Sequence, residues 1–444
     1  MRFPSVTTLV GNEFDGGKYK EDKFSDSVRG ADDCIYGIPF NARRVVKTNP
    51  ADKSLKEIGP DLGADGMRWI CGVMAGNGSI YCIPYYSGKI LKIDTVNETV
   101  TLLDTELPER GMARWISGAL AHDGCIYFMP QDARRILKFN PEDESAVSVG
   151  EDLGGQRYKY SGTVRGNDGY LCGIPFYSNL IVRYNPADRS MTLLGEEADE
   201  YFNCSNGVMG RDGHIYAFSE LLCKMLRIDV KNNTYSFVDN EFLSQLPKRT
   251  GKGWGAAILG NDGCIYWPPI NANRTLKFDP ETQAVSLVGN DFGDTFGKWS
   301  SGAAAGPDGA IYCIPCSATR VLAIDPFKEF AMKIQAEMEQ YPEELGRLFR
   351  KEHEDSKTTY ECAVTKFGIE KVSEVIQDCI PSSVVISGSH LPSFIVAATY
   401  KNSPVCIIYY LLRKNLDSSS LVNRGSDNLS CEEDREESKK RKER

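Results

Sequence analysis

Few residues in this sequence have the types and spacing that catalysis or metal binding requires. Of the four histidines, His122 and His214 lie in or beside predicted hairpins, with no second histidine or carboxylate at metal-ligand spacing. Cys313 and Cys316 form a Cys-x-x-Cys pair at the end of a predicted strand, whereas a redox or zinc role needs a strand-helix-strand context or a second pair. We therefore predict no catalytic residue, no metal and no cofactor, and we leave enzymatic activity open.

A second set of residues is better suited to recognition than to catalysis. Aromatic residues, most of them preceded by a cation, recur at the start of predicted strands, and Trp, Tyr and Arg dominate binding hot spots. The set consists of Arg68, Trp69, Arg114, Trp115, Lys159, Tyr160, Trp254, Lys298 and Trp299. Two roles are open. The set could form a binding surface for a protein or a glycan, or the rings could pack in the core with cations stacked on them, which we weight more heavily.

A sequence repeat positions these candidates. A Gly-x-Ile-Tyr-x-x-Pro pattern recurs seven times at intervals of 44 to 50 residues. Its tyrosine slot is occupied by Tyr36, Tyr81, Tyr127, Cys172, Tyr216, Tyr266 and Tyr312. Asp-Gly pairs in most copies supply the positive φ that a tight hairpin needs, and Asn or Asp follows every slot by 13 residues. Four short strands per unit predict the blade of a β-propeller.

The ends of the chain indicate how the ring closes. The seventh copy stops after three strands at Asp325-Pro326, and its missing fourth strand matches the N-terminus, where residues 6–14 resemble residues 285–292. An N-terminal strand in the last blade removes an open sheet edge. We predict an all-β fold, a seven-bladed β-propeller over residues 5–328 that is closed by this strand.

The units resemble the seven-bladed propellers of the streptogramin (virginiamycin B) lyase and NHL/YWTD-like group. Those repeats share an Asp-Gly hairpin, an aromatic strand and an Asp-Pro-x-Thr turn, as in Asp262-Gly263, Tyr266 and Asp279-Pro280-Glu281-Thr282 here. The resemblance implies the fold over residues 5–328 and says little about activity. The lyases of this group use a histidine-centred acid/base pair with a metal, and no residues of this sequence match that role.

Two repeated charge positions predict structural ion pairs. A basic residue follows the tyrosine slot by eight residues in six copies, and an acidic residue follows it by 25 residues in all seven, counted around the ring. Both positions fall on one face of the ring, near the ends of adjacent strands. The predicted pairs are formed from Arg44, Lys89, Arg135, Arg274 and Arg320 with carboxylates that include Asp61, Asp152 and Asp291. We favour a structural role over a ligand site, because a feature repeated in every blade usually serves the blade.

The composition changes after Pro326. Helix formers at helical spacing predict a helical region over residues 329–413, where segments beginning at Thr358 and Leu391 resemble degenerate ankyrin-like hairpins. Residues 414–444 are rich in serine and charge and are expected to be disordered. The tail contains Lys439-Lys440-Arg441-Lys442, which resembles a nuclear localisation signal.

Charge and hydropathy limit the partners and the compartment. The formal net charge of −9 argues against general nucleic-acid binding. The N-terminus lacks the apolar core of a signal peptide, and no apolar run reaches the roughly 20 residues of a membrane helix. We expect an intracellular protein without membrane association, cytoplasmic or nuclear, whose 14 cysteines are reduced.

These observations predict a non-enzymatic protein-interaction scaffold that uses the loop-rich face of the propeller. The expected partner is a protein. The alternative is a small-molecule lyase or hydrolase acting at the central mouth of the ring. That alternative would need a cluster of polar groups around the axis that is not repeated from blade to blade.

Overall fold

The computed structural model describes residues 6–14, 21–63, 66–109, 111, 113–195, 201–246, 253–299 and 302–326. They belong to a compact unit that spans Met1–Lys328. The predicted helical region with its ankyrin-like hairpins and the predicted charged tail lie outside the described residues. None of the described helices is long and apolar enough to cross a membrane.

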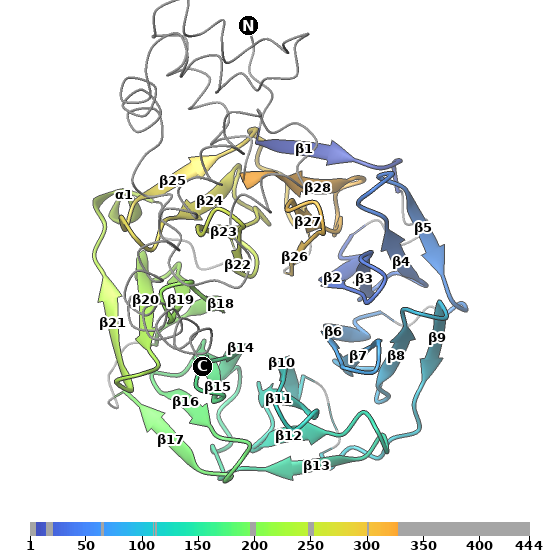
Figure 1. Ribbon diagram of the computed structural model, residues 1–444, viewed down its shortest axis with the longest axis horizontal. Coiled ribbons are helices and arrows are strands. Elements are labelled where there is room, and N and C mark those ends of the chain that lie inside the picture. Colours follow the sequence, from blue (N-terminus) through green and yellow to red (C-terminus); the bar gives the residue numbers. More distant parts are fainter. Residues whose placement is uncertain are drawn as a thin grey trace, which may run out of the picture. The chain divides into compact units, whose positions relative to one another are not determined.

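The described chain forms seven antiparallel sheets of four strands, arranged around an axis (Figure 1). The first blade contains β2 (Phe24–Arg29), β3 (Ile35–Pro39), β4 (Val45–Thr48) and β5 (Leu55–Ile58). The second contains β6 (Trp69–Met74), β7 (Ser79–Pro84), β8 (Leu91–Asp94) and β9 (Thr99–Leu102). The third contains β10 (Trp115–Leu120), β11 (Ile126–Pro130), β12 (Ile136–Phe139) and β13 (Ala146–Val149).

The remaining blades continue the same order from the axis outward. The fourth contains β14 (Tyr160–Arg165), β15 (Leu171–Pro175), β16 (Ile181–Tyr184) and β17 (Met191–Leu194). The fifth contains β18 (Cys204–Met209), β19 (His214–Ser219), β20 (Lys224–Asp229) and β21 (Thr234–Val238), followed by the short helix α1 (Glu241–Ser244). The sixth contains β22 (Ile258–Leu259), β23 (Ile265–Trp267), β24 (Thr275–Phe278) and β25 (Val285–Val288).

The seventh blade confirms the predicted closure. It contains β26 (Ala304–Ala305), β27 (Ile311–Cys313) and β28 (Val321–Ile324), and its outer strand is the N-terminal β1 (Thr7–Val10). β1 pairs antiparallel with β28 from Thr7 opposite Ile324 to Val10 opposite Val321. The Thr7 hydroxyl also accepts a hydrogen bond of 2.7 Å from the Asn290 backbone N–H in the sixth blade. The ring is therefore closed by three strands from one end of the chain and one from the other.

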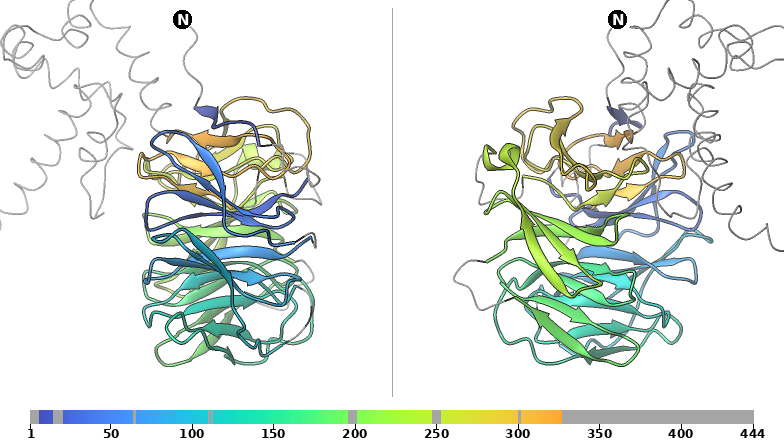
Figure 2. Two further views of the ribbon diagram at one scale, coloured as in Figure 1. Left: turned by 90° about the vertical axis from the view of Figure 1, so that its right-hand side faces the viewer. Right: turned by 60° about the vertical axis from the view of Figure 1, so that its left-hand side comes forward.

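The ring has two faces, which are seen from the side in Figure 2. We call the face on which the innermost strands begin the entry face, and the face on which they end the hairpin face. Because neighbouring strands are antiparallel, the connections from second to third strand and from one blade to the next lie on the entry face. The tight hairpins from first to second and from third to fourth strand lie on the hairpin face.

The hydrophobic core lies between adjacent blades. The second strand of each blade carries the tyrosine slot, and every residue of β3, β7, β11 and β15 is buried. One apolar cluster joins Tyr81 and Ile83 of the second blade to Trp115, Phe128 and other residues of the third. Each sheet thus buries both of its faces against its neighbours, which explains why the second strands do not alternate between polar and apolar residues.

Removal of residues 1–14 is expected to lower the melting temperature by at least about 5 °C, because the seventh blade loses its outer strand and exposes a sheet edge. Differential scanning calorimetry measures the effect. A matched control that lacks only residues 1–5 retains β1 and should melt as the wild type does. An unchanged melting temperature after the longer deletion would contradict the importance of the β1–β28 pairing.

Candidate functional site

The recurring tryptophans of the predicted binding set are buried. Trp69 and Trp115 are each 1% exposed, and the indole Nε1 of each donates a hydrogen bond to a backbone carbonyl oxygen, of Lys89 at 2.8 Å and of Arg135 at 3.0 Å. Trp254 and Trp299 are also buried and make the equivalent bonds to the carbonyl oxygens of the residues just before their third strands. Each indole side chain thus fixes the connection between the second and third strands of its own blade. Tyr160 occupies this position in the fourth blade and is buried as well.

The cations of the same set hold the loops that join the blades. Arg68, Lys159 and Lys298 are buried. The Lys298 Nζ donates to the Gly293 and Thr295 carbonyl oxygens at 2.9 and 2.7 Å, and Arg68 donates to the carbonyl oxygens of Gly63 and Ala42. Burial lowers the pKa of Lys159, whose Nζ donates to the Gly154 and Gln156 carbonyl oxygens.

Arg114 lies 3.8 Å from Glu109, and its side chain is one third exposed. The other eight residues of the set are buried, so the structure favours the packing role over direct binding. Trp69 and Trp115 present no open ring face to a sugar. The first blade has its own copy of this motif, Lys23-Phe24, which was not predicted. It stands twelve residues before the tyrosine slot, the spacing of most other copies, and its Lys23 Nζ donates to the Ala318 carbonyl oxygen at 2.9 Å.

The predicted ion pairs differ from the observed contacts by one residue in two blades. Arg43 rather than Arg44 contacts the Asp61 carboxylate, at 2.9 Å from Nε to Oδ1, whereas Arg44 donates to the Gly59 carbonyl oxygen. Arg134 rather than Arg135 contacts Asp152, at 2.7 Å, and Arg135 donates to the Gly150 carbonyl oxygen. In each blade the two arginines are adjacent in the bend before the third strand, and the first contacts the carboxylate while the second contacts a backbone carbonyl oxygen.

The other predicted pairs have varied outcomes. The Arg274 Nε lies 4.0 Å from the Asp291 Oδ2, as predicted, although both side chains are about half exposed. Lys89 pairs with Asp104, which lies just after the fourth strand of the same blade. Arg320 donates to the carbonyl oxygens of Gly11 and Leu9, at 3.1 and 3.0 Å, and so anchors the N-terminal segment.

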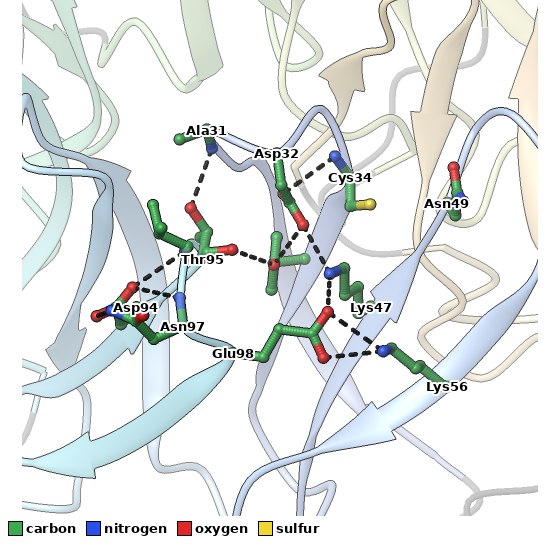
Figure 3. Close-up of polar contacts among 12 residues, drawn as sticks. Ala31, Asp32, Cys34, Lys47, Asn49, Lys56, Asp94, Thr95, Asn97 and Glu98 are labelled. Carbon is green, nitrogen blue, oxygen red and sulfur yellow. Dashed lines mark hydrogen bonds and ion pairs between the residues drawn. The ribbon is translucent and has the colours of Figure 1, made fainter.

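A polar network on the hairpin face links neighbouring blades (Figure 3). The Tyr36 hydroxyl donates to the Asp32 Oδ2 at 3.0 Å, and the Lys47 Nζ lies 2.6 Å from the same oxygen. Lys47 also contacts Glu98 of the second blade, and Lys56 lies 2.9 Å from Glu98. Burial alone would raise the pKa of Asp32, but the hydrogen bonds from Lys47 and Tyr36 lower it below its ordinary value.

This network is repeated around the ring and was missed by the sequence analysis. A basic residue follows the tyrosine slot by eleven residues in six blades: Lys47, Lys92, Lys138, Arg183, Arg227 and Lys277. The seventh blade has Ala323 at this position. There, Lys53 from the first blade supplies the cation, 2.9 Å from the Asp308 Oδ2 and 4.9 Å from the centre of the Tyr312 ring. The constant spacing was the signal that could have revealed this network.

Two of the histidine and cysteine candidates, His214 and Cys316, have surroundings that affect their chemistry. No carboxylate was expected near His214, but two are present. Asp212 lies 3.1 Å from Nδ1 and Asp229 lies 3.6 Å from Nε2. Arg227 lies 2.7 Å from Nε2. Among the described residues, no group of three His, Cys, Asp or Glu side chains is suited to a metal ion. Burial raises the pKa of the Cys316 thiol to about 12, which disfavours the reactive thiolate.

The entry end of the axis contains a cavity of about 220 Å³ whose polar lining differs between blades, although Ser161 and Ser205 hold equivalent positions. Polar residues from the first, third, fourth and fifth blades line it: Asp26, Ser117, Ser161, Asn203, Ser205, Asn206 and Glu220. Apolar parts of the wall include Ile70, Ile116, Phe176 and Trp254. The position ten residues before the tyrosine slot is occupied by Asp26, Cys71, Ser117, Gly162, Asn206 and Ala256 in the first six blades.

Irregular pairing of the innermost strands positions these side chains. The register shifts after the first residue of β2, β6, β10 and β14 and after the second of β18. Such a bulge leaves backbone groups without ladder partners. The Gly72 N–H donates to the Asp26 Oδ2 at 3.1 Å, and the Thr163 N–H donates to the Ser117 hydroxyl at 3.1 Å. Polar side chains of one blade thus satisfy the backbone of the next.

Asp26 is a carboxyl group of this cavity whose pKa is shifted by its surroundings. Its Oδ1 accepts from the Ser27 N–H at 2.8 Å, and a Cβ on Gly302 of the seventh blade would overlap with its carboxylate. Burial raises its pKa from 3.8 to about 6, against the opposing effect of the hydrogen bonds from the Gly72 and Ser27 N–H groups. The charge of Asp26 therefore changes close to neutral pH.

Exposed and partly exposed aromatic rings lie on the entry face, and one of them, Phe176, lines the cavity. We call Tyr86, Tyr158, Phe176, Tyr177 and Tyr201 the aromatic rim. Tyr177 lies 4.6 Å from the ring of Phe176, which lines the cavity, 6.1 Å from Tyr158 and 5.9 Å from Tyr201, measured between ring centroids. Tyr86, Tyr177 and Tyr201 are 45%, 39% and 45% exposed.

The rim continues into the second blade and was not recognised in the sequence. The ring centroids of Tyr85 and Tyr86 lie 5.0 Å apart. The pKa of Tyr85 is raised, mainly by burial and to a smaller extent by the nearby Tyr158 and Tyr86. The Arg157 guanidinium lies 5.3 Å from the centre of the Tyr158 ring. The signal that could have revealed the rim is the aromatic pair directly after the second strand in two blades, Tyr85-Tyr86 and Phe176-Tyr177.

Lys53→Met is expected to lower the free energy of unfolding by about 0.5–1 kcal/mol, because Lys53 and Asp308 are both partly exposed. Ala323→Lys places a cation in the seventh blade at the position that lysine or arginine holds in the others. The double variant should recover most of the loss in urea denaturation. If the effects of Lys53→Met and Ala323→Lys on stability simply add, the interpretation that Lys53 replaces the missing third-strand cation is wrong.

Asp26→Asn is expected to change how stability depends on pH. Because the folded-state pKa of Asp26 is raised, its contribution to stability is fully present below about pH 3.8 and is lost as the pH rises through about 6. The stability of Asp26→Asn relative to the wild type should therefore increase from pH 4 to pH 7.5, by roughly 1–3 kcal/mol. Urea denaturation measures this difference. Ser117→Ala alters the same cavity without a titratable group, so its difference from the wild type should not vary with pH.

The fold is similar to that of several propeller proteins of known structure. No protein-family model and no curated protein matches the chain. A streptogramin B lyase structure superposes with a TM-score of 0.58 and 16% identity, covering 71% of this chain and 97% of that one. A catalytically inactive virginiamycin B lyase from Staphylococcus aureus with quinupristin superposes with a TM-score of 0.58 and 14% identity. The match covers 71% of this chain and 98% of that one. The hydrazine synthase of Kuenenia stuttgartiensis superposes with a TM-score of 0.54 and 11% identity. The match covers 69% of this chain and 96% of that one. At these identities the similarity establishes a seven-bladed β-propeller like that of virginiamycin B lyase, and it assigns no activity.

Proposed function

We propose that this protein is a non-enzymatic interaction scaffold that binds a protein partner through the entry face of its propeller. The observation that carries the proposal is the aromatic rim, in which Tyr86, Tyr177 and Tyr201 are exposed and Tyr177 packs against Phe176 of the axial cavity. Tyrosine supplies a large contact area with few rotatable bonds and is enriched in protein interfaces.

The contrast between buried and exposed aromatics supports this assignment. The aromatic residues that recur in most blades, such as Tyr81 and Trp115, are buried and hold the blades together. The rim residues do not recur in every blade, and no packing requirement of the fold explains them. Adjacent exposed apolar surface of this kind is typical of binding sites. The expected intracellular location, in the cytoplasm or in the nucleus through Lys439-Lys440-Arg441-Lys442, belongs to the same proposal.

A lyase or hydrolase acting on a small molecule at the central mouth is a second candidate. The polar lining of the axial cavity, which differs between blades, favours it, since that is the feature such an enzyme requires. A carboxyl group whose pKa is raised to about 6 is suited to general acid/base catalysis near neutral pH, and Asp26 would have that role. Turnover of a substrate that Asp26→Asn abolishes in a folded protein would support the enzyme over the scaffold.

The scaffold proposal is tested by affinity capture from native lysate with three forms of the full-length protein. The rim variant carries Tyr86→Ser, Tyr177→Ser and Tyr201→Ser. The control carries Leu102→Ser, Val147→Ser and Leu193→Ser, which remove equally exposed apolar residues from outer strands. All six positions are exposed, so both variants should fold, and circular dichroism verifies this.

We expect a near-stoichiometric partner that the wild type and the control retain and that the rim variant binds at least about tenfold more weakly. The affinity is then measured with the purified partner. Capture of the same partner by the rim variant at wild-type affinity, or no partner for the wild type, would refute the proposal.

A further inference from the structure

The axial cavity is rich in hydrogen-bond acceptors and poor in positive charge. Two carboxylates, Asp26 and Glu220, line it together with serine hydroxyls and asparagine amides, and none of its described lining residues is Lys, Arg or His. The two carboxylates belong to the first and fifth blades, on different sides of the axis (Figure 1). A ligand that complements this lining donates hydrogen bonds and carries positive charge.

Both carboxylates are held in place by backbone N–H groups. The Asp26 carboxylate accepts hydrogen bonds from the Ser27 and Gly72 N–H groups, and the Cys71 side chain also hydrogen-bonds to it. Glu220 accepts from the Gly253 N–H at 2.8 Å to both oxygens and from the Trp254 N–H at 3.0 Å. A carboxylate has about four lone-pair sites, so Asp26 retains acceptor capacity beyond these three bonds. Its position is fixed before a ligand arrives, which lowers the entropic cost of binding.

The walls and the size of the cavity restrict the group further. Phe176 and Trp254 offer aromatic surface for a cation, and Ile70 and Ile116 offer apolar surface for an aliphatic stem. The volume of about 220 Å³ is below the roughly 300–1,000 Å³ of sites for drug-sized ligands. The cavity is therefore suited to a single side chain or a small amine rather than to a large substrate.

We propose that the axial cavity binds one positively charged nitrogen group, an ammonium or a guanidinium, with the Asp26 carboxylate as its counter-ion. The group belongs to a lysine or arginine side chain that the partner inserts at the centre of the aromatic rim. The inference rests on the proposed scaffold function in naming this source, and a free small amine is the other source of the same chemistry. The net charge of −9 favours the approach of cations.

The chemistry is tested without a partner. The full-length protein is titrated by isothermal calorimetry at pH 7.5 with n-butylguanidinium and n-butylammonium chloride, at ionic strength matched with NaCl. The neutral probe n-butylurea has a similar shape and no charge. We expect saturable binding of one cation per protein, at least tenfold weaker binding to Asp26→Asn, and no comparable binding of the urea.

Two controls make this titration decisive. Asp104→Asn removes a carboxylate that is 87% exposed and lies outside the cavity lining, and it should bind the cations as the wild type does. It therefore separates the local effect of Asp26 from a general change in net charge. Equal binding of the urea, equal loss in the two variants, or no saturable binding of either cation would overturn the inference.

A second arm identifies the source of the cation and separates the two proposals. Asp26→Asn is added to the capture experiment with the rim variant. Loss of the captured partner with Asp26→Asn assigns the cation to the partner's side chain. Retention of the partner, with cation binding still dependent on Asp26, assigns the cavity to a free amine. If no partner is captured, the scaffold proposal fails while the calorimetric result still decides the chemistry of the cavity.

Discussion

Four residue pairs between β1 and β28 join the two ends of the propeller, although the paired residues stand more than 300 positions apart in the sequence. The other six blades are continuous in sequence, so the seventh is where the ring can open. Its hairpin-face network is also incomplete, because Ala323 replaces the usual cation and Lys53 of the first blade contacts Asp308 instead. The N-terminal part of the chain thus supplies both contacts, and both join the first and last parts of the ring.

Residue positions that recur from blade to blade have a different role in the propeller from those that vary. The tyrosine slot, the residue that begins each innermost strand and the basic residue of the third strand recur because every blade must pack against the next. The bulge in the innermost strand creates a different requirement. Its free N–H groups need an acceptor but not a particular residue, and Asp26 and Ser117 both satisfy it. The axial layer can therefore vary between blades without loss of the fold, and this freedom makes it available for function.

The constant spacing of the tyrosine slot was enough to predict the number of blades and the closing strand, because hairpin and strand lengths leave little freedom within a blade. Contacts that depend on a shift of one residue were not predictable. Arg43 and Arg44 are adjacent and only the first contacts the carboxylate, and the bulge beside Asp26 adds a residue without a sequence signal. The neighbours of His214 were missed for a related reason, since Asp229 stands directly opposite it on the next strand and not at a local spacing. The charged pairs around the ring were therefore predicted by type and position, but not by partner.

Asp26 connects the axial cavity to the closure of the ring. Its carboxylate contacts Gly302 of the seventh blade and Gly72 of the second, so it lies on the inner side of the blades that meet where the ring closes. An ionised carboxylate at this place lowers stability, because burial raises its pKa. A bound cation favours the ionised form and offsets that cost, and by linkage it stabilises the folded ring in proportion to its affinity. Occupation of the cavity and closure of the propeller are then coupled through one side chain.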